Sequence, residues 1–144
     1  MNRSSQSQRL LQAGVALFLG AVLLGLAVPY FTIPRLALAA HLVGTLQGIV
    51  LVVAGLLWVR LSLTPAQFTL VFWLLLYQAV VAPLSNLLAA AWGAGTSIIP
   101  IAAGTARGSA VQEAVINIGL RSAGAALIVA LLLILWGLRR APVA

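Results

Sequence analysis

The 144-residue sequence contains no cysteine, no lysine, one acidic residue and one histidine. Without cysteine, the chain forms no disulfide, holds no iron–sulfur cluster and attaches no haem through a cysteine motif. A single carboxylate, Glu113, provides neither a pair of carboxylates for acid–base catalysis nor a Ser-His-Asp constellation. No glycine motif for a dinucleotide or a phosphate is present. These absences make hydrolysis and hydride transfer less suited to this chain than a rearrangement.

Hydrophobic residues dominate what remains. They make up 63% of the chain, only 6% of residues are charged, and the mean hydropathy is +1.17. Such values lie outside the range of soluble domains. Several apolar stretches of about 20 residues are long enough to cross roughly 30 Å of hydrocarbon. We therefore predict an all-α integral membrane protein in which residues 1–144 form a single domain.

Hydropathy predicts four transmembrane helices, at residues 11–32, 36–59, 67–92 and 113–138, that form one bundle. Thr64 and Pro65 have the order expected of an N-cap followed by proline in the first helical turn. The first apolar run is too long for a secretory signal and lacks a clear cleavage site, so we expect it to be retained. The connection at residues 93–112 is apolar but rich in Gly, Ser and Thr. It either lies on the membrane surface or folds back into the bundle.

The arginines predict the orientation of the chain in the membrane. Four spans place both termini on one side, and most arginines lie there. The positive-inside rule then predicts a multi-pass protein of the cytoplasmic (inner) membrane with both termini in the cytoplasm. Because the arginines are scattered singly at helix ends, they do not form a nucleic-acid-binding patch. The terminal side carries Arg3, Arg9, Arg60, Arg139 and Arg140, and the opposite side carries Arg35 and Arg107.

Polar side chains inside the spans are costly in hydrocarbon and are therefore the main functional candidates. His41, Asn86, Asn117 and Arg121 all fall within roughly 6–12 Å of the same membrane face, as judged from a rise of 1.5 Å per residue. Gln47 lies one to two turns deeper than His41 on the same span. If the helices turn these residues inward, they form one polar site open toward the face opposite the termini.

The fourth span places Glu113, Asn117 and Arg121 at intervals of four residues along one stripe, which favours an inward-facing position. One interpretation is structural, with Glu113 and Arg121 bridged through Asn117 so that the arginine joins helices. The other is functional, with Arg121 binding an anionic group such as a haem propionate or a substrate oxygen. The sequence does not choose between the two.

His41 shares a helical stripe with Gly44 and Gly48, while Gln47 lies on an adjoining face. The histidine either forms a packing hydrogen bond or ligates a metal. One subunit cannot supply the three or four ligands of a zinc site, whereas haem iron needs only one and would keep an open position. The amides of Gln47 and Asn86 would orient a small polar group there. This inventory favours isomerisation over hydrolysis or hydride transfer.

The segment from His41 to Gly48, HLVGTLQG, resembles the His-x5-Asn/Gln-Gly signature of a small family of four-helix membrane isomerases. This family comprises hydroxylaminobenzene mutases and styrene oxide isomerases, and the Ser85-Asn86 pair is similar to a Ser-Asn pair in it. The resemblance implies a ferric haem b held by His41, near the subunit contacts of a homotrimer. It also implies that Gln47 and Asn86 face the substrate side of the haem.

Two departures from the epoxide isomerases favour the mutase branch. Ala90 stands where those enzymes have a tyrosine, and Leu84 where they have a tryptophan. The resemblance then implies rearrangement of a small, membrane-soluble aromatic hydroxylamine, such as phenylhydroxylamine, to 2-aminophenol. We expect Gln47 and Asn86 to be catalytic. The expected substrate contacts are Gln47, Asn86 and Asn117, and the expected cofactor contacts are His41, Gly44, Gly48 and Arg121.

Three alternatives remain open from the sequence. The first is a styrene oxide isomerase-type rearrangement of an epoxide to an aldehyde. The second is a haem or quinone electron-transfer subunit without catalysis of its own. The third is a structural or transport membrane protein without a cofactor, in which Gly44 and Gly48 serve only to let a neighbouring helix approach.

Overall fold

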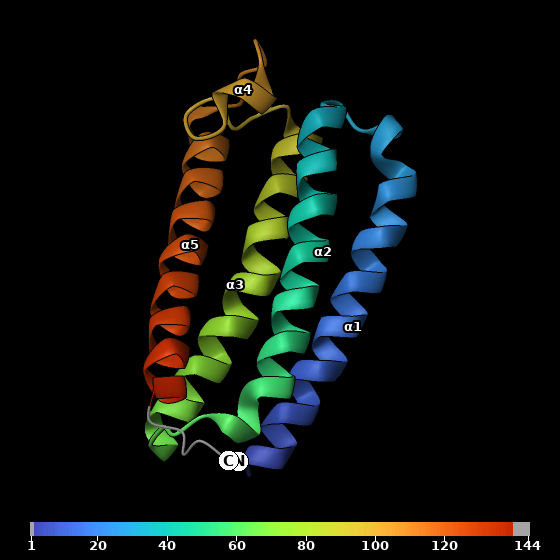
Figure 1. Cartoon of the computed structure of the whole chain (residues 1–144). Helices are drawn as coiled ribbons and strands as arrows, with labels where there is room; N and C mark the ends of the chain where they lie inside the picture. The colour runs from blue at the N-terminus through green and yellow to red at the C-terminus, as the bar shows by residue number, and fades with distance from the viewer. Residues whose placement is uncertain (1, 140–144) are drawn as a thin grey trace.

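The computed structural model describes residues 2–139, and they form an all-helical protein (Figure 1). Four of the helices are long and apolar enough to cross a membrane, which confirms the predicted fold class. The chain passes along the length of the molecule four times, in alternating directions. The first and last described residues therefore lie at the same end (Figure 1). In chain order the elements are α1 (Arg3–Ala27), η1 (Val28–Tyr30), α2 (Pro34–Leu57), η2 (Trp58–Arg60), α3 (Pro65–Trp92), α4 (Pro100–Ala103) and α5 (Ala110–Arg139).

Local sequence signals set the bounds of α3. Thr64 is the N-cap and forms a capping box with Gln67, and Pro65 occupies the first turn, as predicted. The helix ends at Gly93, whose φ of 66° is a left-handed conformation that favours glycine. Pro34 begins α2 in the same way as Pro65 begins α3.

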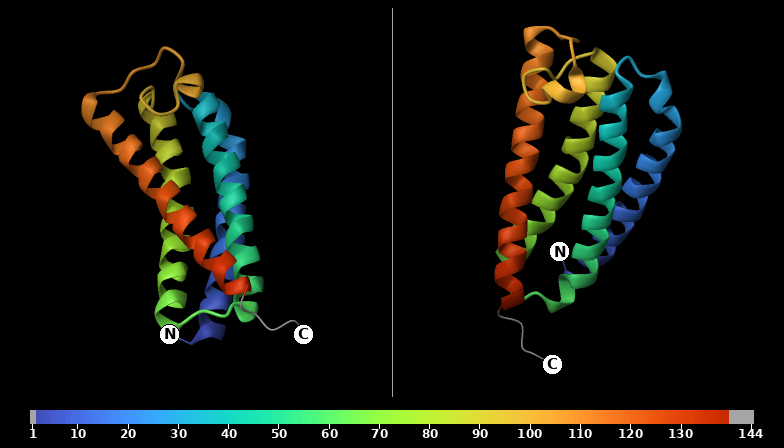
Figure 2. Two further views of the ribbon diagram at one scale, coloured as in Figure 1. Left: turned by 60° about the vertical axis from the view of Figure 1, so that its left-hand side comes forward. Right: turned by 45° about the horizontal axis from the view of Figure 1, so that its top comes forward.

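The long helices are arranged as a row rather than as a closed square. α1 packs against α2, α2 against α3, and α3 against α5. α1 and α5 therefore lie at opposite ends of the row, as the right-hand view of Figure 2 shows. Each end of the row leaves one side of a helix without a neighbour from the same chain.

Small residues bring α1 and α2 into close contact. A Cβ added at Gly14 would lie 2.7 Å from the Gly48 carbonyl oxygen, and one added at Gly48 would lie 2.8 Å from the Gly14 carbonyl oxygen. Any side chain here would push the backbones apart. In a bilayer, where burial of apolar surface does not drive helix association, such close backbone packing is a main source of stability.

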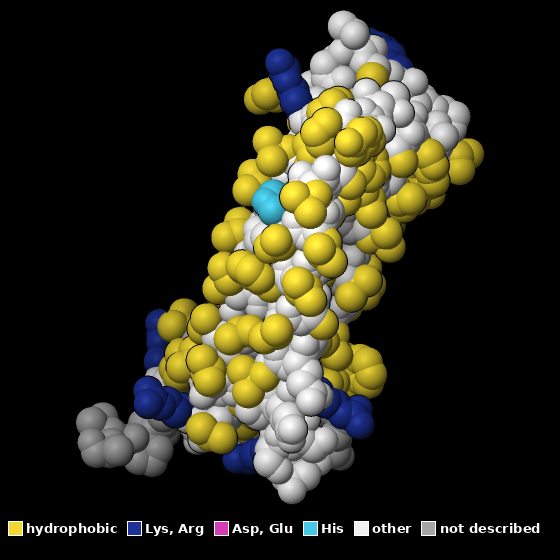
Figure 3. Space-filling view, turned by 90° about the vertical axis from the view of Figure 1, so that its right-hand side faces the viewer, with side chains coloured by type: hydrophobic (Ala, Val, Ile, Leu, Met, Phe, Trp, Pro, Cys, Tyr) yellow, Lys and Arg dark blue, Asp and Glu magenta, His cyan; other side chains and the backbone are white. Residues whose placement is uncertain are grey.

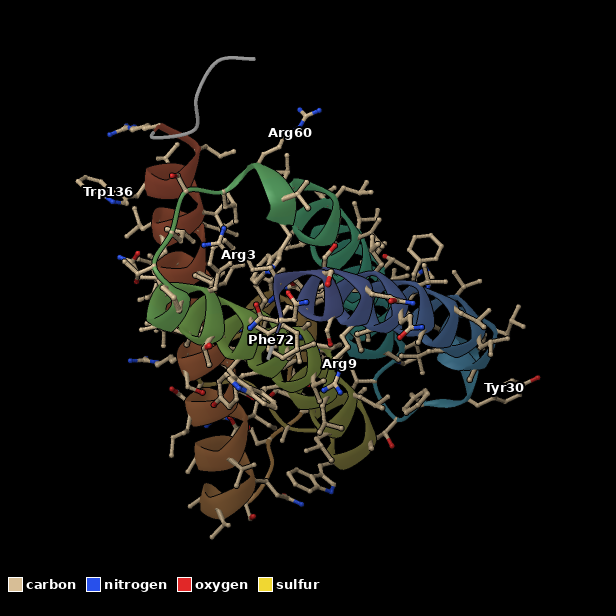
Figure 4. All side chains as sticks on the ribbon, turned by 90° about the horizontal axis from the view of Figure 1, so that it is seen from below. Arg3, Arg9, Tyr30, Arg60, Phe72 and Trp136 are labelled. Carbon is tan, nitrogen blue, oxygen red and sulfur yellow. The ribbon has the colours of Figure 1, made fainter. Side chains whose placement is uncertain are left out.

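α1 begins at Arg3, eight residues before the predicted span. Its first two turns are polar but pack against the end of α2. The buried Gln6 accepts a hydrogen bond from Trp58 Nε1 at 3.3 Å, and Ser7 Oγ donates to the Gly55 carbonyl at 2.8 Å. Arg3 lies 4.3 Å from the centre of the Phe68 ring. Figure 4 shows Arg3, Arg9 and Arg60 at this end of the molecule. Hydropathy alone did not predict these first turns of α1, because polar contacts stabilise them.

The connection between α3 and α5 forms a cap at the opposite end. Ala94 and Ala103 are buried in an apolar cluster with Ile116 of α5, together with residues from the ends of α2 and α3. On the face shown in Figure 3, hydrophobic side chains cover the surface between the two ends, and the basic side chains lie toward the ends. This distribution matches a belt that faces lipid between two polar membrane faces.

Candidate functional site

His41 lies on α2 at its contact with α1, and its ring is half-buried. Nδ1 donates a hydrogen bond to the Ala21 carbonyl oxygen of α1 at 2.6 Å. This bond places the proton on Nδ1 and leaves the lone pair of Nε2 available as a ligand. In Figure 3 the single histidine is visible at the surface of the α1 and α2 side, among hydrophobic side chains. The ring therefore faces outward rather than into the bundle.

Gly25 makes room for this arrangement on α1. A Cβ added at Gly25 would lie 2.9 Å from His41 Nδ1 and 3.0 Å from its Cε1. The ring can reach the Ala21 carbonyl only because residue 25 has no side chain. Neither the glycine nor the carbonyl was identified as part of the site from the sequence, since a backbone oxygen has no sequence signature.

Residues of α1 occupy the space beside Gly44 and Gly48. An added Cβ at Gly44 would lie 2.8 Å from the Ala21 Cβ, and one at Gly48 would lie 2.9 Å from the Phe18 Cβ. Both glycines therefore serve the helix contact in this chain, the second of the two roles considered for them. Their effect on His41 is indirect, because they bring Ala21 within reach of its ring.

Gln47 of α2 and Asn86 of α3 both have polar side-chain atoms buried within the bundle. Gln47 lies about 120° around α2 from His41, at 3.6 residues per turn, and its buried Oε1 has no donor among the described residues. Asn86 is 5% exposed and donates from Nδ2 to the Ala82 carbonyl at 3.0 Å. Gln78 is fully buried, and its Oε1 also has no donor within residues 2–139. Buried carbonyl oxygens without donors are rare and are available to accept from a ligand.

An apolar groove of about 390 Å³ lies between α1, α2 and α3. Its walls include Leu84 of α3 and Gly44 of α2, whereas His41, Gln47 and Asn86 are not among its lining residues. An apolar cavity of about 150 Å³ is sufficient to bind benzene. The groove is therefore large enough for a monocyclic aromatic compound. Other lining residues are Ala21, Leu24, Ala40 and Pro83.

The carboxylate of Glu113 does not pair with Arg121. It binds the segment that connects α3 and α5. This carboxylate accepts five hydrogen bonds of 2.8–3.4 Å: from the backbone N–H groups of Gly95, Thr96, Ser97 and Gly108, and from the Ser97 hydroxyl. The donors come from both ends of the segment between α3 and α5. The carboxylate thus holds the cap closed, and its hydrogen-bonding capacity is used there.

The prediction that Arg121 faces inward, on a stripe with Glu113 and Asn117, is wrong. Arg121 lies 180° around α5 from Ala130, which is fully buried, at 3.6 residues per turn. The side chain is exposed, and the carboxylate of Glu113, the only acidic residue of the sequence, is hydrogen-bonded in the cap instead. Asn117 donates to Ser97 Oγ at 3.4 Å, so it joins the cap and does not bridge Glu113 to Arg121. The reason is that α5 packs through its small residues, which turns the opposite face outward.

One chain therefore divides the predicted site residues into separate groups. Gln47 and Asn86 have buried polar atoms, and Asn117 lies beside the cap. His41 faces outward on α2 beside α1, and Arg121 faces outward on α5. Within residues 2–139 no three His, Cys, Asp or Glu residues are close enough to form a metal site. A cofactor that needs one protein ligand is compatible with His41, because its Nε2 is free and its ring is held by Ala21.

Comparisons with known proteins agree with the resemblance to the membrane isomerases. The family model described as Styrene oxide isomerase matches residues 6–139. Hydroxylaminobenzene mutase HabB of Ectopseudomonas oleovorans is 43% identical over 136 residues, which cover 94% of this chain and 83% of the relative. Hydroxylaminobenzene mutase HabA of the same organism is 40% identical over 131 residues, which cover 91% and 97%. No solved structure matches the chain significantly.

Proposed function

Because the chain belongs to the styrene oxide isomerase family and is an isomerase of the membrane, we propose that it converts an aromatic hydroxylamine to an ortho-aminophenol. The two relatives are named for hydroxylaminobenzene, and phenylhydroxylamine is the simplest substrate of this class. The reaction breaks the N–O bond and forms a C–O bond at the ortho carbon. The ring loses one proton and the nitrogen gains one, so no reductant or oxidant is consumed.

The observation that carries this proposal is the hydrogen bond from His41 Nδ1 to the Ala21 carbonyl at 2.6 Å. It orients the only histidine of the chain so that Nε2 is free to ligate a ferric haem b. When bound, haem would supply an open Lewis-acid position that weakens the N–O bond. The carbonyl would hold the ring in place and make Nε2 a better donor, as outer partners of metal-ligating histidines do.

The apolar groove and the inner amides would serve the substrate. The groove would accommodate an aromatic ring that has dissolved in the bilayer, since its volume is about 390 Å³. Gln47 Oε1, which has no donor, would accept from the N–H or O–H of the hydroxylamine, and Asn86 would hydrogen-bond the transferring hydroxyl. Asn117 would contribute a third amide at the cap side. The surrounding apolar side chains would exclude water, which otherwise competes for the migrating group.

Epoxide isomerisation is the second candidate, because the matching family model is named for styrene oxide. One residue of the sequence argues against it. Ala90 is fully buried in the cluster beneath the cap. It offers no hydroxyl in place of the tyrosine of the epoxide isomerases, so we expect slower turnover of styrene oxide than of phenylhydroxylamine.

The test compares wild-type protein with His41→Ala after expression with ample haem. We expect a Soret band and formation of 2-aminophenol without added reductant, and we expect both to be lost in the variant. Haem that undergoes reduction and oxidation without any product would indicate an electron-transfer subunit. A wild-type protein that isomerises the substrate without haem would overturn the cofactor assignment, and faster turnover of styrene oxide would favour the second candidate.

A further inference from the structure

Two glutamines within the bundle each have a carbonyl oxygen without a donor. Gln78, halfway along α3, is fully buried, and its Nε2 donates to the Leu75 carbonyl at 3.1 Å. Because a carbonyl only accepts, the amide nitrogen must face Leu75, and Oε1 is the atom that remains. Neither this oxygen nor the buried Oε1 of Gln47 has a donor within residues 2–139. Buried acceptors of this kind are rare because they are costly, so both oxygens require a donor.

The donors nearest to Gln78 along α3 bind elsewhere. Ser85 and Asn86 each donate to the backbone carbonyl four residues earlier, at 2.7 and 3.0 Å. The Tyr77 hydroxyl forms a hydrogen bond with the Ser122 hydroxyl at 2.8 Å. A neighbouring copy of the chain cannot reach Gln78, since it is fully buried within its own chain. The donor is therefore a small molecule inside the bundle.

The two acceptors lie at nearly the same depth. A Cβ added at Gly44 of α2 would lie 3.7 Å from the Pro83 Cβ of α3, which sets the alignment of the two helices. Gln47 lies three residues from Gly44, and Gln78 lies five residues from Pro83, both toward the end where the described chain begins and ends. With a rise of 1.5 Å per residue, their levels differ by about 3 Å.

Both glutamines also border the same apolar cluster between α2 and α3. Gln47 lies one turn before Leu51, and Gln78 lies three residues after Leu75. Leu51 and Leu75 belong to one buried cluster. The axes of packed helices are about 8–10 Å apart, a distance that two glutamine side chains and one water molecule can span.

The apolar groove does not bring a larger ligand to Gln78. The residues of α3 that line it lie roughly 120° or more around the helix from Gln78, at 3.6 residues per turn. They are Val80, Pro83, Leu84 and Leu87. Ser85 lies only about 20° from Gln78 and contacts Gly119 of α5, so Gln78 faces the packed interior. Water is small enough for such a place, and its two O–H groups match two acceptors.

From these observations we propose that Gln47 and Gln78 bind one buried water molecule, which donates one O–H to each Oε1. The water joins α2 to α3 and fixes the amide of Gln47. A carbonyl oxygen has two lone pairs, so Gln47 can accept from the water and, resting on the proposed function, from the hydroxylamine as well. Gln78 is then a positioning residue, which acts on the substrate only through the water and Gln47.

Methionine substitutions test the shared water, because methionine keeps the length of glutamine but lacks a strong acceptor. Gln47→Met and Gln78→Met should each lower the Tm in detergent by about 2–4 °C, since each leaves the other oxygen without a full bridge. The double variant should lose less than the sum of the two shifts. Gln12→Met, at an exposed position of α1, is the matched control and should leave the Tm unchanged. A higher Tm in Gln78→Met, or shifts that simply add, would overturn the proposal.

Infrared difference spectra in ordinary and ¹⁸O-labelled water identify the donor. Wild-type protein should show an O–H stretching band of an isolated water that shifts with the isotope, and either methionine variant should lose it. Coupled Tm shifts without an isotope-sensitive band would mean that the glutamines interact without water, which contradicts the proposal.

Turnover of phenylhydroxylamine separates positioning from a purely structural role. Gln78→Met should lower kcat by up to about 100-fold with little change in KM, because the amide that loses its orientation acts in the reaction step. Gln78→Glu, as a neutral buried acid, keeps a carbonyl oxygen and should retain the band and most of the turnover. Unchanged kcat in Gln78→Met would refute the positioning role. Wild-type protein without any turnover would refute the proposed function, while the Tm and infrared results would still decide whether the water is bound.

Discussion

At the scale of single residues, one hydrogen bond defines the chemistry available to His41. An imidazole has two nitrogens, and the Ala21 carbonyl accepts from Nδ1, so Nε2 keeps its lone pair. A neutral hydrogen bond of this kind contributes only about 0.5–1.5 kcal/mol to stability. Its main consequence is orientation, because the ring cannot rotate without losing that partner. Gly25 permits this orientation, since any Cβ there would contact the ring.

Gly25→Ala should therefore displace the His41 ring and weaken the haem binding that we propose for it. The added Cβ would lie 2.9 Å from Nδ1, and loss of the outer partner of a metal-ligating histidine typically costs about 10–100-fold in affinity. Haem titration followed at the Soret band measures the effect. Gly20→Ala is the matched control on α1, because a Cβ there meets nothing within 4 Å. Equal affinities in the two variants would mean that Gly25 does not position the ring.

At the scale of elements, Glu113 organises the segment between α3 and α5. This segment contains α4, a single helical turn that cannot be stable alone. Its order comes from apolar contacts with the ends of α2 and α3 and from backbone N–H groups that converge on one carboxylate. Hydrogen bonds to a charged acceptor are stronger than neutral ones. One acidic side chain thus replaces the regular hydrogen bonding that the connection lacks.

Glu113→Ala should loosen the cap while leaving the four long helices in place. Loss of the charged acceptor should cost about 1.5–3 kcal/mol of unfolding free energy. Limited proteolysis within residues 93–109 should become faster, and thermal unfolding in detergent should shift to lower temperature. Arg107→Ala, which changes an exposed residue of the same segment, serves as the control. Identical proteolysis of the two variants would show that other contacts hold the cap.

At the scale of the whole molecule, the row of helices presents a hydrophobic belt with basic ends (Figure 3). The described ends of α1 and α5 lie together with η2 at one end, and the cap lies at the other (Figure 1). Arg3, Arg9, Arg60 and Arg139 belong to the first end. Arg140, which also entered the charge count, lies outside the described residues. This asymmetry continues to predict that the termini face the cytoplasm.

Single cysteines test that orientation cleanly, because the native chain has none. In intact cells, a membrane-impermeant maleimide should label Thr105→Cys in the cap and should not label Ser4→Cys at the start of α1. Both positions are exposed, so permeabilised cells should show labelling of both and serve as the control. Labelling of Ser4→Cys alone in intact cells would show that the termini face the outside and that the predicted orientation is wrong.

Composition and hydropathy were sufficient to predict the number of spans, because a lipid environment requires about 20 apolar residues in each. The family prediction from the His41–Gly48 motif and the Ser85-Asn86 pair is also confirmed. The start of α1 was missed because Gln6 and Ser7 are stabilised by Trp58 and Gly55, which are distant in sequence. Depth along each helix follows from a constant rise per residue, and the common depth of the polar residues below one membrane face stays a prediction.

The direction in which each polar residue faces was not readable in this way. Periodicity places Glu113, Asn117 and Arg121 on one stripe, but it does not say which neighbour that stripe meets. The choice depends on which helix faces pack best, and α5 uses its small residues against α3, so Arg121 turns outward. Likewise, the sequence left open whether His41 forms a packing hydrogen bond or ligates a metal. Only the packing of α1 on α2 showed that a backbone carbonyl orients it and leaves one nitrogen free.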